Sequence, residues 1–163
     1  MSKLQHIELR LSRFSDAEAI MELDKLVWDE STTPGQIKWN SRAHFLQTCP
    51  PGSQLVAVIN GGLCGYLGFA PPTPLPSNKH VYEINIAVHP DFQGYGVGVQ
   101  LISELKELAT QQGVRKLSLR VLSSNKRAIS FYQRCGFVEQ GRLVEEFYLQ
   151  GSYVDDVLMY FHL

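Results

Sequence analysis

Residues 81–98, VYEINIAVHPDFQGYGVG, decide how the rest of the chain is read. The first eight are mostly apolar and rich in β-branched side chains, which predicts a strand buried on both faces. Pro90 ends the strand, because proline has no N–H for a ladder and disfavours a helical conformation at the residue before it. The hydrophobic period then changes from two to 3.6, which predicts a helix from Val97 to a C-cap at Gly113.

The link between this strand and helix, residues 93–98, carries glycine at every second position in QGYGVG. Glycine lets the backbone approach a ligand, with several N–H groups pointing to one spot at the positive end of a helix. The pattern predicts a phosphate or pyrophosphate site, to which Gln93 adds a donor. A simple tight turn is the alternative, and the strand-to-helix context favours the anion site. The spacing fits neither a P-loop nor the G-x-G-x-x-G fingerprint of dinucleotide-binding proteins.

Gln-x-x-Gly-x-Gly after Val-x-Pro resembles the acetyl-CoA-binding motif of the GNAT superfamily of acyl-CoA N-acyltransferases. The resemblance implies that residues 93–98 hold the pyrophosphate, and that the pantetheine arm lies along the main chain of residues 86–88. For the strand residues, ordinary core packing is the alternative. The cofactor-binding residues implied in these two segments are Ile86, Ala87, Val88, Gln93, Gly94, Tyr95, Gly96, Val97 and Gly98.

Residues 125–137, NKRAISFYQRCGF, resemble the second motif of the family, which is Asn-x-x-Ala, an aromatic pair and Gly-Phe. The resemblance implies that Asn125 and Ala128 bind the cofactor, and Asn125 is equally suited to cap a helix. It implies that Tyr132 is the general acid, since a phenol of pKa ~10 is protonated at neutral pH and can protonate the departing CoA thiolate, parent pKa ~8.5. A core tyrosine with its hydroxyl satisfied is the alternative.

The acceptor amine needs a base, because an amine of pKa ~10.4 is almost wholly cationic at pH 7. Glu83 stands near where several family members place a glutamate, although a one-residue slip in register would turn it to the other sheet face. Arg120 stands where ribosomal-protein acetyltransferases of the superfamily carry a glutamate base, and so departs from their pattern. The acidic residues that attract a cationic amine, or simply form solvated surface, are Asp29, Glu30, Glu145, Glu146, Asp155 and Asp156.

Length, composition and charge limit the class of protein to which the chain can belong. With 163 residues and 44% hydrophobic content, the chain is expected to form one N-acetyltransferase domain, residues 1–163. A net charge of −1 without a basic block excludes nucleic acid as an obvious partner. No apolar run could span a bilayer and residues 1–13 lack a signal-peptide core, so no membrane partner and a cytoplasmic location are expected. Three scattered cysteines predict neither disulfides nor a metal site.

The predicted element order is β-α-α-β-β-β-α-β-α-β-β, an α/β fold with a mixed, mostly antiparallel twisted sheet of about seven strands flanked by about four helices, as in GNAT proteins. The first helix is expected to begin at a capping box of Ser15 with Glu18 and to end at Trp28. The other expected helices are 37–48, 97–113 and 125–135. The expected strands are 6–11, 54–59, 63–69, 81–88, 116–122, 137–149 and 153–163, with a hairpin at Asn60-Gly61-Gly62.

These residues predict an acetyl-CoA-dependent N-acetyltransferase in which a primary amine attacks directly in a ternary complex. Its partner is a small-molecule or peptide amine. Residues 141–159 resemble the subgroup of polyamine and phosphinothricin-type acetyltransferases, so a polyamine, an amino acid or its analogue, and a protein N-terminus all stay open. Family analogy also allows a homodimer through the late strands. A non-catalytic acyl-CoA-sensing module and a protein N-terminal acetyltransferase of the same superfamily are the alternatives, while the glycine spacing disfavours a nucleotide-dependent oxidoreductase.

Overall fold

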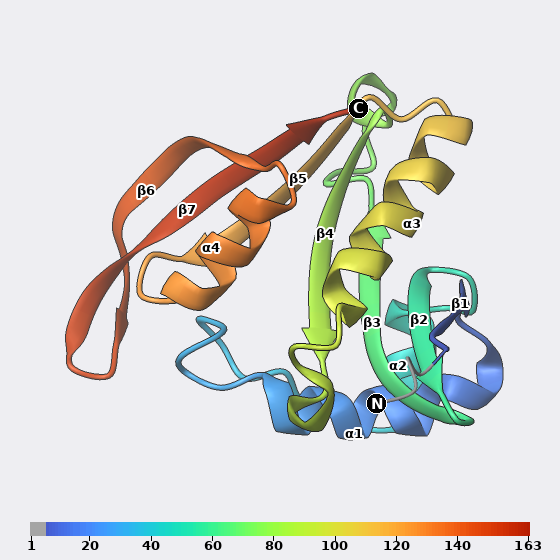
Figure 1. The fold of residues 1–163 in the computed structure, drawn as a ribbon. Helices are drawn as coiled ribbons and strands as arrows, with labels where there is room; N and C mark the ends of the chain where they lie inside the picture. Colours follow the sequence, from blue (N-terminus) through green and yellow to red (C-terminus); the bar gives the residue numbers. More distant parts are fainter. Residues whose placement is uncertain (1–5) are drawn as a thin grey trace. The chain divides into compact units, whose positions relative to one another are not determined.

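The computed structural model describes residues 6–163, which form a seven-stranded sheet and four α-helices (Figure 1). The strands are β1 (Glu8–Leu11), β2 (Gln54–Ile59), β3 (Gly62–Ala70), β4 (Val81–Val88), β5 (Lys116–Leu122), β6 (Val138–Leu149) and β7 (Ser152–His162). The helices are α1 (Ala17–Val27), α2 (Arg42–Thr48), α3 (Val97–Gln111) and α4 (Lys126–Arg134). The strand order is β1-β2-β3-β4-β5-β7-β6, with β4 and β5 parallel. The predicted fold class and element order are confirmed.

The chain groups into two compact units, each described by itself. The first contains the described residues up to Val27, Lys38–Phe69 and Asn85–Glu107. Strand β2 is buried along its whole length and pairs antiparallel with β1 and β3. The turn between β2 and β3 has positive φ at Asn60 (50°) and Gly61 (80°), as a type I′ hairpin requires. The predicted hairpin is therefore confirmed.

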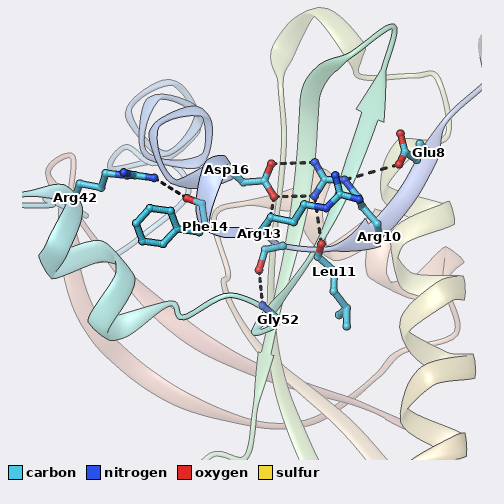
Figure 2. A network of polar contacts seen from close by, with 9 residues as sticks. Glu8, Arg10, Leu11, Arg13, Phe14, Asp16, Arg42 and Gly52 are labelled. Atoms are coloured by element: carbon cyan, nitrogen blue, oxygen red, sulfur yellow. Dashed lines mark hydrogen bonds and ion pairs between the residues drawn. The ribbon is translucent and has the colours of Figure 1, made fainter.

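The start of α1 differs from the predicted capping box. A 3-10 turn at Phe14–Asp16 precedes the helix, and the backbone N–H of Arg13 donates to Asp16 Oδ2 at 2.7 Å (Figure 2). Arg10 donates to both Asp16 oxygens, at 2.7 and 3.0 Å. Ser15 lies inside the turn, and Glu18 instead forms an ion pair with Arg42 at 3.2 Å. The carboxylate that caps this turn is thus that of Asp16, whose charge Arg10 of β1 neutralises.

The second helix begins five residues later than predicted, at Arg42. The Ser41 hydroxyl accepts the backbone N–H of His44 at 3.0 Å, so Ser41, itself in an extended conformation, is the N-cap. Trp39 lies outside the helix. Its Nε1 donates to the buried carboxylate of Asp24 at 2.8 Å and its ring stands edge-on to Phe45. Trp39 therefore packs against the helices from outside them and does not belong to an apolar helix face.

The second unit contains Trp28–Ile37, Ala70–Ile84 and Leu108–Leu163. In it β5 pairs with β7, and β6 and β7 form a long antiparallel hairpin, orange to red in Figure 1. Helix α3 ends in this unit at Gln111. Gly113 follows with φ of 79°, and Val114 N donates to Ala109 O at 2.9 Å, which confirms the predicted C-cap. Helix α4 begins and ends within one residue of the prediction.

The prediction that β4 is buried on both faces holds only in part. Residues two apart in a strand share a face, so Val81 and Ala87 lie on one face and Ile84 on the other, and all three are buried. Glu83 and Asn85, which share the face of Val81 and Ala87, are exposed. That face of β4 is therefore polar in its middle and buried at its two ends.

No helix of residues 6–163 is long and apolar enough to cross a membrane. No group of three or more His, Cys, Asp or Glu side chains is arranged to hold a metal ion within that part of the chain. The expected cytoplasmic location and homodimer stay predictions.

Candidate active site

The loop before α3 contains two left-handed glycines, Gly94 with φ of 86° and Gly96 with φ of 80°. A Cβ atom at either position would meet no atom within 4 Å, so the backbone conformation requires glycine and the space beside it is open. The first intrahelical bond of α3 is donated by Gln100 to the carbonyl of Gly96 at 3.0 Å. The N–H groups of residues 97–99 precede that bond and point away from the helix, which fits an anionic ligand.

The side chains of this loop differ in what they can offer. Gln93 is exposed, and Tyr95 is 61% exposed. Val97 is buried, so it can contribute only its backbone N–H. The loop therefore fits the pyrophosphate through main-chain donors, with Gln93 as the polar side chain beside them.

Gly65 on β3 packs against Ala87 and Val97, which lie before and after the loop. The sequence did not single out this glycine. A Cβ atom there would lie 3.0 Å from the carbonyl oxygen of Ala87 and 3.1 Å from Val97 Cγ1. The N–H of His89 donates to the carbonyl of Cys64 at 2.8 Å, beside the same contact. Strand β3 thus fixes the end of β4 and the first residue of α3 together. A glycine within an apolar strand was the available signal, since such a glycine often marks a close backbone approach.

At the end of β4, Ala87 is a core residue, whereas Ile86 and Val88 are half-buried. Ala87 can therefore contact a ligand only through its main chain. The parallel pairing of β4 with β5 includes Val81–Glu83 and Lys116–Ser118, so the last five residues of β4 lie beyond this register. That is the part of the strand expected to offer its backbone to an amide-bearing arm.

Asn125 and Tyr132 belong to α4. The Asn125 side chain accepts the N–H of Ala128 at 3.2 Å, so the predicted helix cap is confirmed. Tyr132 is 8% exposed, and its ring contacts Phe131 and Phe137 with centroids 5.4 and 5.8 Å away. Burial, with a smaller contribution from Cys135, raises the pKa of the Tyr132 phenol well above its usual value. The phenol therefore stays protonated at neutral pH.

Glu83 is exposed on β4 in register with Ser118 of β5. Register partners share a sheet face, and Ser118 and Arg120 share that face by their spacing of two. Glu83 and Arg120 therefore stand on the same face of neighbouring strands. The residues 86–88 and 93–98 belong to the first unit, whereas Glu83, Asn125, Ala128 and Tyr132 belong to the second.

The other acidic residues differ in their surroundings. Asp29 accepts the N–H and hydroxyl of Ser31 at 2.8 and 2.5 Å, and these bonds lower its pKa. Asp155 accepts the N–H of Glu145 at 2.9 Å and pairs with Arg142 at 3.2 Å, which also lowers its pKa. Both carboxylates are used in local structure. Asp156 is only 3% exposed and so does not belong to a solvated face.

A family model described as the acetyltransferase (GNAT) family matches residues 20–137. The chain belongs to this family. Its predicted recognition as GNAT and its class as an acyltransferase are confirmed.

Two characterised relatives show different degrees of coverage. The spermidine N(1)-acetyltransferase of Vibrio cholerae is 39% identical over 79 residues, which are 48% of this chain and 46% of that protein. The match thus spans about half of that relative. The L-amino acid N-acyltransferase MnaT of Escherichia coli is 27% identical over 166 residues, covering 96% of this chain and 94% of MnaT.

Solved structures share the whole fold. The smu.2055 protein of Streptococcus mutans is 30% identical with a TM-score of 0.88, over 95% of this chain and 98% of its own. The putative acetyltransferase yncA of Salmonella typhimurium, solved with its cofactor acetyl-CoA, has a TM-score of 0.82 at 24% identity, over 97% and 94% of the two chains. This second likeness supports the fold.

Proposed function

We propose that the chain, as a single domain of residues 1–163, is an acetyl-CoA-dependent N-acetyltransferase that acts on a primary amine. The loop at residues 93–98 carries this proposal, because Gly94 and Gly96 turn main-chain donors toward open space at the start of α3. A structure of the same fold is described with acetyl-CoA bound. When bound, acetyl-CoA supplies the thioester whose acyl group is transferred.

Three groups of residues hold the cofactor in this proposal. The N–H groups of residues 94–98 and the side chain of Gln93 bind the pyrophosphate. The main chain of Ile86, Ala87 and Val88 pairs with the amides of the pantetheine arm. Asn125 and Ala128 contact the arm from α4, and Asn125 does so with its amide nitrogen because its oxygen caps the helix.

Two side chains move protons while both substrates are bound. Glu83 receives the proton of the acceptor ammonium, which frees the nitrogen lone pair for attack on the thioester carbon. As the N–C bond forms and the C–S bond breaks, Tyr132 gives its phenolic proton to the sulfur. The raised pKa of Tyr132 keeps the proton available at neutral pH but makes its transfer to a thiolate uphill in the free protein. The acylated nitrogen loses its second proton to water as the amide forms, Tyr132 regains a proton from water, and Glu83 releases its proton to solvent.

The acceptor is proposed to be a small-molecule or peptide amine. The names of the two relatives point to a polyamine in one case and an L-amino acid in the other. A protein N-terminus stays the alternative within the superfamily.

Gly96→Val tests the cofactor site, with Gly113→Val as the matched control. Both glycines have φ near 80° and open space for a Cβ, so both variants carry the same backbone strain, at opposite ends of α3. Calorimetric titration with acetyl-CoA is expected to show affinity lowered more than about tenfold, ~1.4 kcal/mol, only for Gly96→Val. Equal affinities in folded variants contradict the site. Acetyl-CoA binding without amine-dependent CoA release would favour the sensing module.

A further inference from the structure

One face of the second unit carries charged residues on three adjacent strands. Glu83 on β4 is in register with Ser118, whose face Arg120 shares on β5. Arg120 is in register with Leu158, and Asp156 shares the face of Leu158 on β7. We call Glu83, Arg120 and Asp156 the charged face.

Asp156 is the buried member of the charged face. It is 3% exposed, and its Oδ2 accepts Arg120 Nη1 at 3.3 Å. Burial raises the pKa of Asp156, Arg120 opposes this, and Glu146 and Glu83 add to it. A buried carboxylate requires a partner, and here the partner is a cation whose side chain is 57% exposed. Asp156 therefore restricts where the Arg120 guanidinium can lie.

Arg120 keeps unused hydrogen-bonding capacity. Among the residues that the structure describes, its guanidinium donates the single bond to Asp156, and a guanidinium has five N–H donors. The exposed edge is thus a planar fork that matches a carboxylate in two-point geometry. Glu83 on the adjacent strand supplies the opposite charge. Diagonal neighbours on paired strands are ~7–8 Å apart, within reach of long side chains.

We propose that Arg120, positioned by Asp156, binds a carboxylate of the acceptor, so that the acceptor is an amino acid or amino-acid analogue rather than a polyamine. The inference rests on the proposed transferase function. An α-amino acid carries an ammonium and a carboxylate on one carbon, and it pairs the first with Glu83 and the second with Arg120. A polyamine offers the guanidinium no acceptor and places a second cation beside it.

The test compares amino acids with the same molecules lacking the carboxylate, as in L-methionine against 3-(methylthio)propylamine and L-arginine against agmatine. The wild-type kcat/KM is expected to be higher for each amino acid. Arg120→Gln is expected to lower kcat/KM for amino acids ~10–100-fold, mainly through KM, because a hydrogen bond to a charged group is lost. For the amines that lack the carboxylate, kcat/KM should change less than about threefold in Arg120→Gln. Asp156→Asn should weaken the same preference, and Asp156→Glu should partly restore it.

Arg142→Gln is the matched control. It removes the same charge from an exposed arginine, but Arg142 is in register with Val157 and so lies on the opposite face from Asp156. This variant should leave the preference unchanged. A wild-type preference for the amines, or an equal loss of both substrate classes in Arg120→Gln, overturns the proposal.

A binding measurement separates this proposal from the proposed function. Calorimetric titration of the amino acids into protein saturated with CoA involves no turnover. Amino-acid binding that Arg120→Gln abolishes, without CoA release from acetyl-CoA, would support the Arg120 site and contradict the transferase. Turnover of polyamines with no detectable amino-acid binding would support the transferase and overturn the Arg120 site.

Discussion

Gly65→Ala is the sharpest test of how β3 supports the cofactor loop. The added methyl group would press on the Ala87 carbonyl at 3.0 Å and on Val97 Cγ1 at 3.1 Å. Neither neighbour can move freely, since the first is backbone and the second is a buried side chain at the start of α3. The variant therefore requires the end of β4 or the start of α3 to shift.

Two other glycines of β3 provide graded controls. Gly62→Ala would meet only the carbonyl of Ile59 at 3.6 Å, an ordinary contact. Gly68→Ala would overlap Asn85 Oδ1, but Asn85 is exposed and its amide can rotate away. We therefore expect Gly62→Ala to be the most stable of the three variants, Gly68→Ala to be intermediate and Gly65→Ala to be the least stable.

The magnitudes follow from two opposing effects. Alanine in place of glycine in a strand stabilises by ~0.5–1 kcal/mol, because the unfolded chain has less freedom to lose. Overpacking costs ~1–3 kcal/mol. We expect Gly62→Ala to be neutral or stabilising, Gly68→Ala to be near zero, and Gly65→Ala to be destabilising by ~1–2 kcal/mol.

Urea denaturation followed by circular dichroism measures the three free energies of unfolding, and titration with acetyl-CoA measures affinity. Gly65→Ala should also weaken acetyl-CoA binding several-fold, since the displaced residues flank the loop. If Gly65→Ala matched Gly62→Ala in both stability and affinity, the inferred role of β3 would be refuted.

Two further predictions concern Tyr132 and Asp16. Tyr132→Phe should lower kcat ~10²–10⁴-fold with acetyl-CoA affinity unchanged, as measured by CoA release and titration, and unchanged turnover would exclude the phenol as the acid. Asp16→Asn should destabilise by ~1.5–3 kcal/mol at pH 7, because the amide keeps only one of the two acceptor oxygens that Arg10 and the Arg13 N–H use and loses the charge that pairs with Arg10. Glu22→Gln, in an exposed pair with Lys25, should cost less than ~0.5 kcal/mol. Hydrogen bonding to Arg10 lowers the pKa of folded Asp16, so its contribution is present above the unfolded pKa of ~3.9 and is lost as pH falls through the folded value. If the difference in unfolding free energy between the wild type and Asp16→Asn stayed constant down to pH 2, the inferred role of the Asp16 carboxylate would be contradicted.

The sequence was most informative where local chemistry determines the conformation. The Asn60-Gly61 turn, the Gly113 C-cap and the Asn125 N-cap each depend on a few adjacent residues, and all three were predicted correctly. The loop glycines Gly94 and Gly96 belong to the same class, because their positive φ is a local property.

The errors arose where a distant partner decides. Asp16 rather than Glu18 caps the first turn because Arg10 of β1 neutralises it. Trp39, which was predicted to be helical, lies outside the helix and donates its indole N–H to Asp24. Gly65 has a role that is visible only once β3 and α3 are packed. In each case the deciding contact joins residues that no short window of sequence contains.

Asp155 and Asp156 show most directly what strand register adds. They are adjacent and chemically identical, so the sequence predicts the same two alternatives for both, attraction of a cationic amine or a solvated surface. In the structure they point to opposite faces of β7, as neighbours in a strand must. Asp155 caps the β6 bulge at Glu145 and pairs with Arg142, and its pKa is lowered. Asp156 is buried beside Arg120, and its pKa is raised. A register shifted by one residue would exchange the two roles, so the pairing of β5 with β7 determines which carboxylate positions the Arg120 guanidinium.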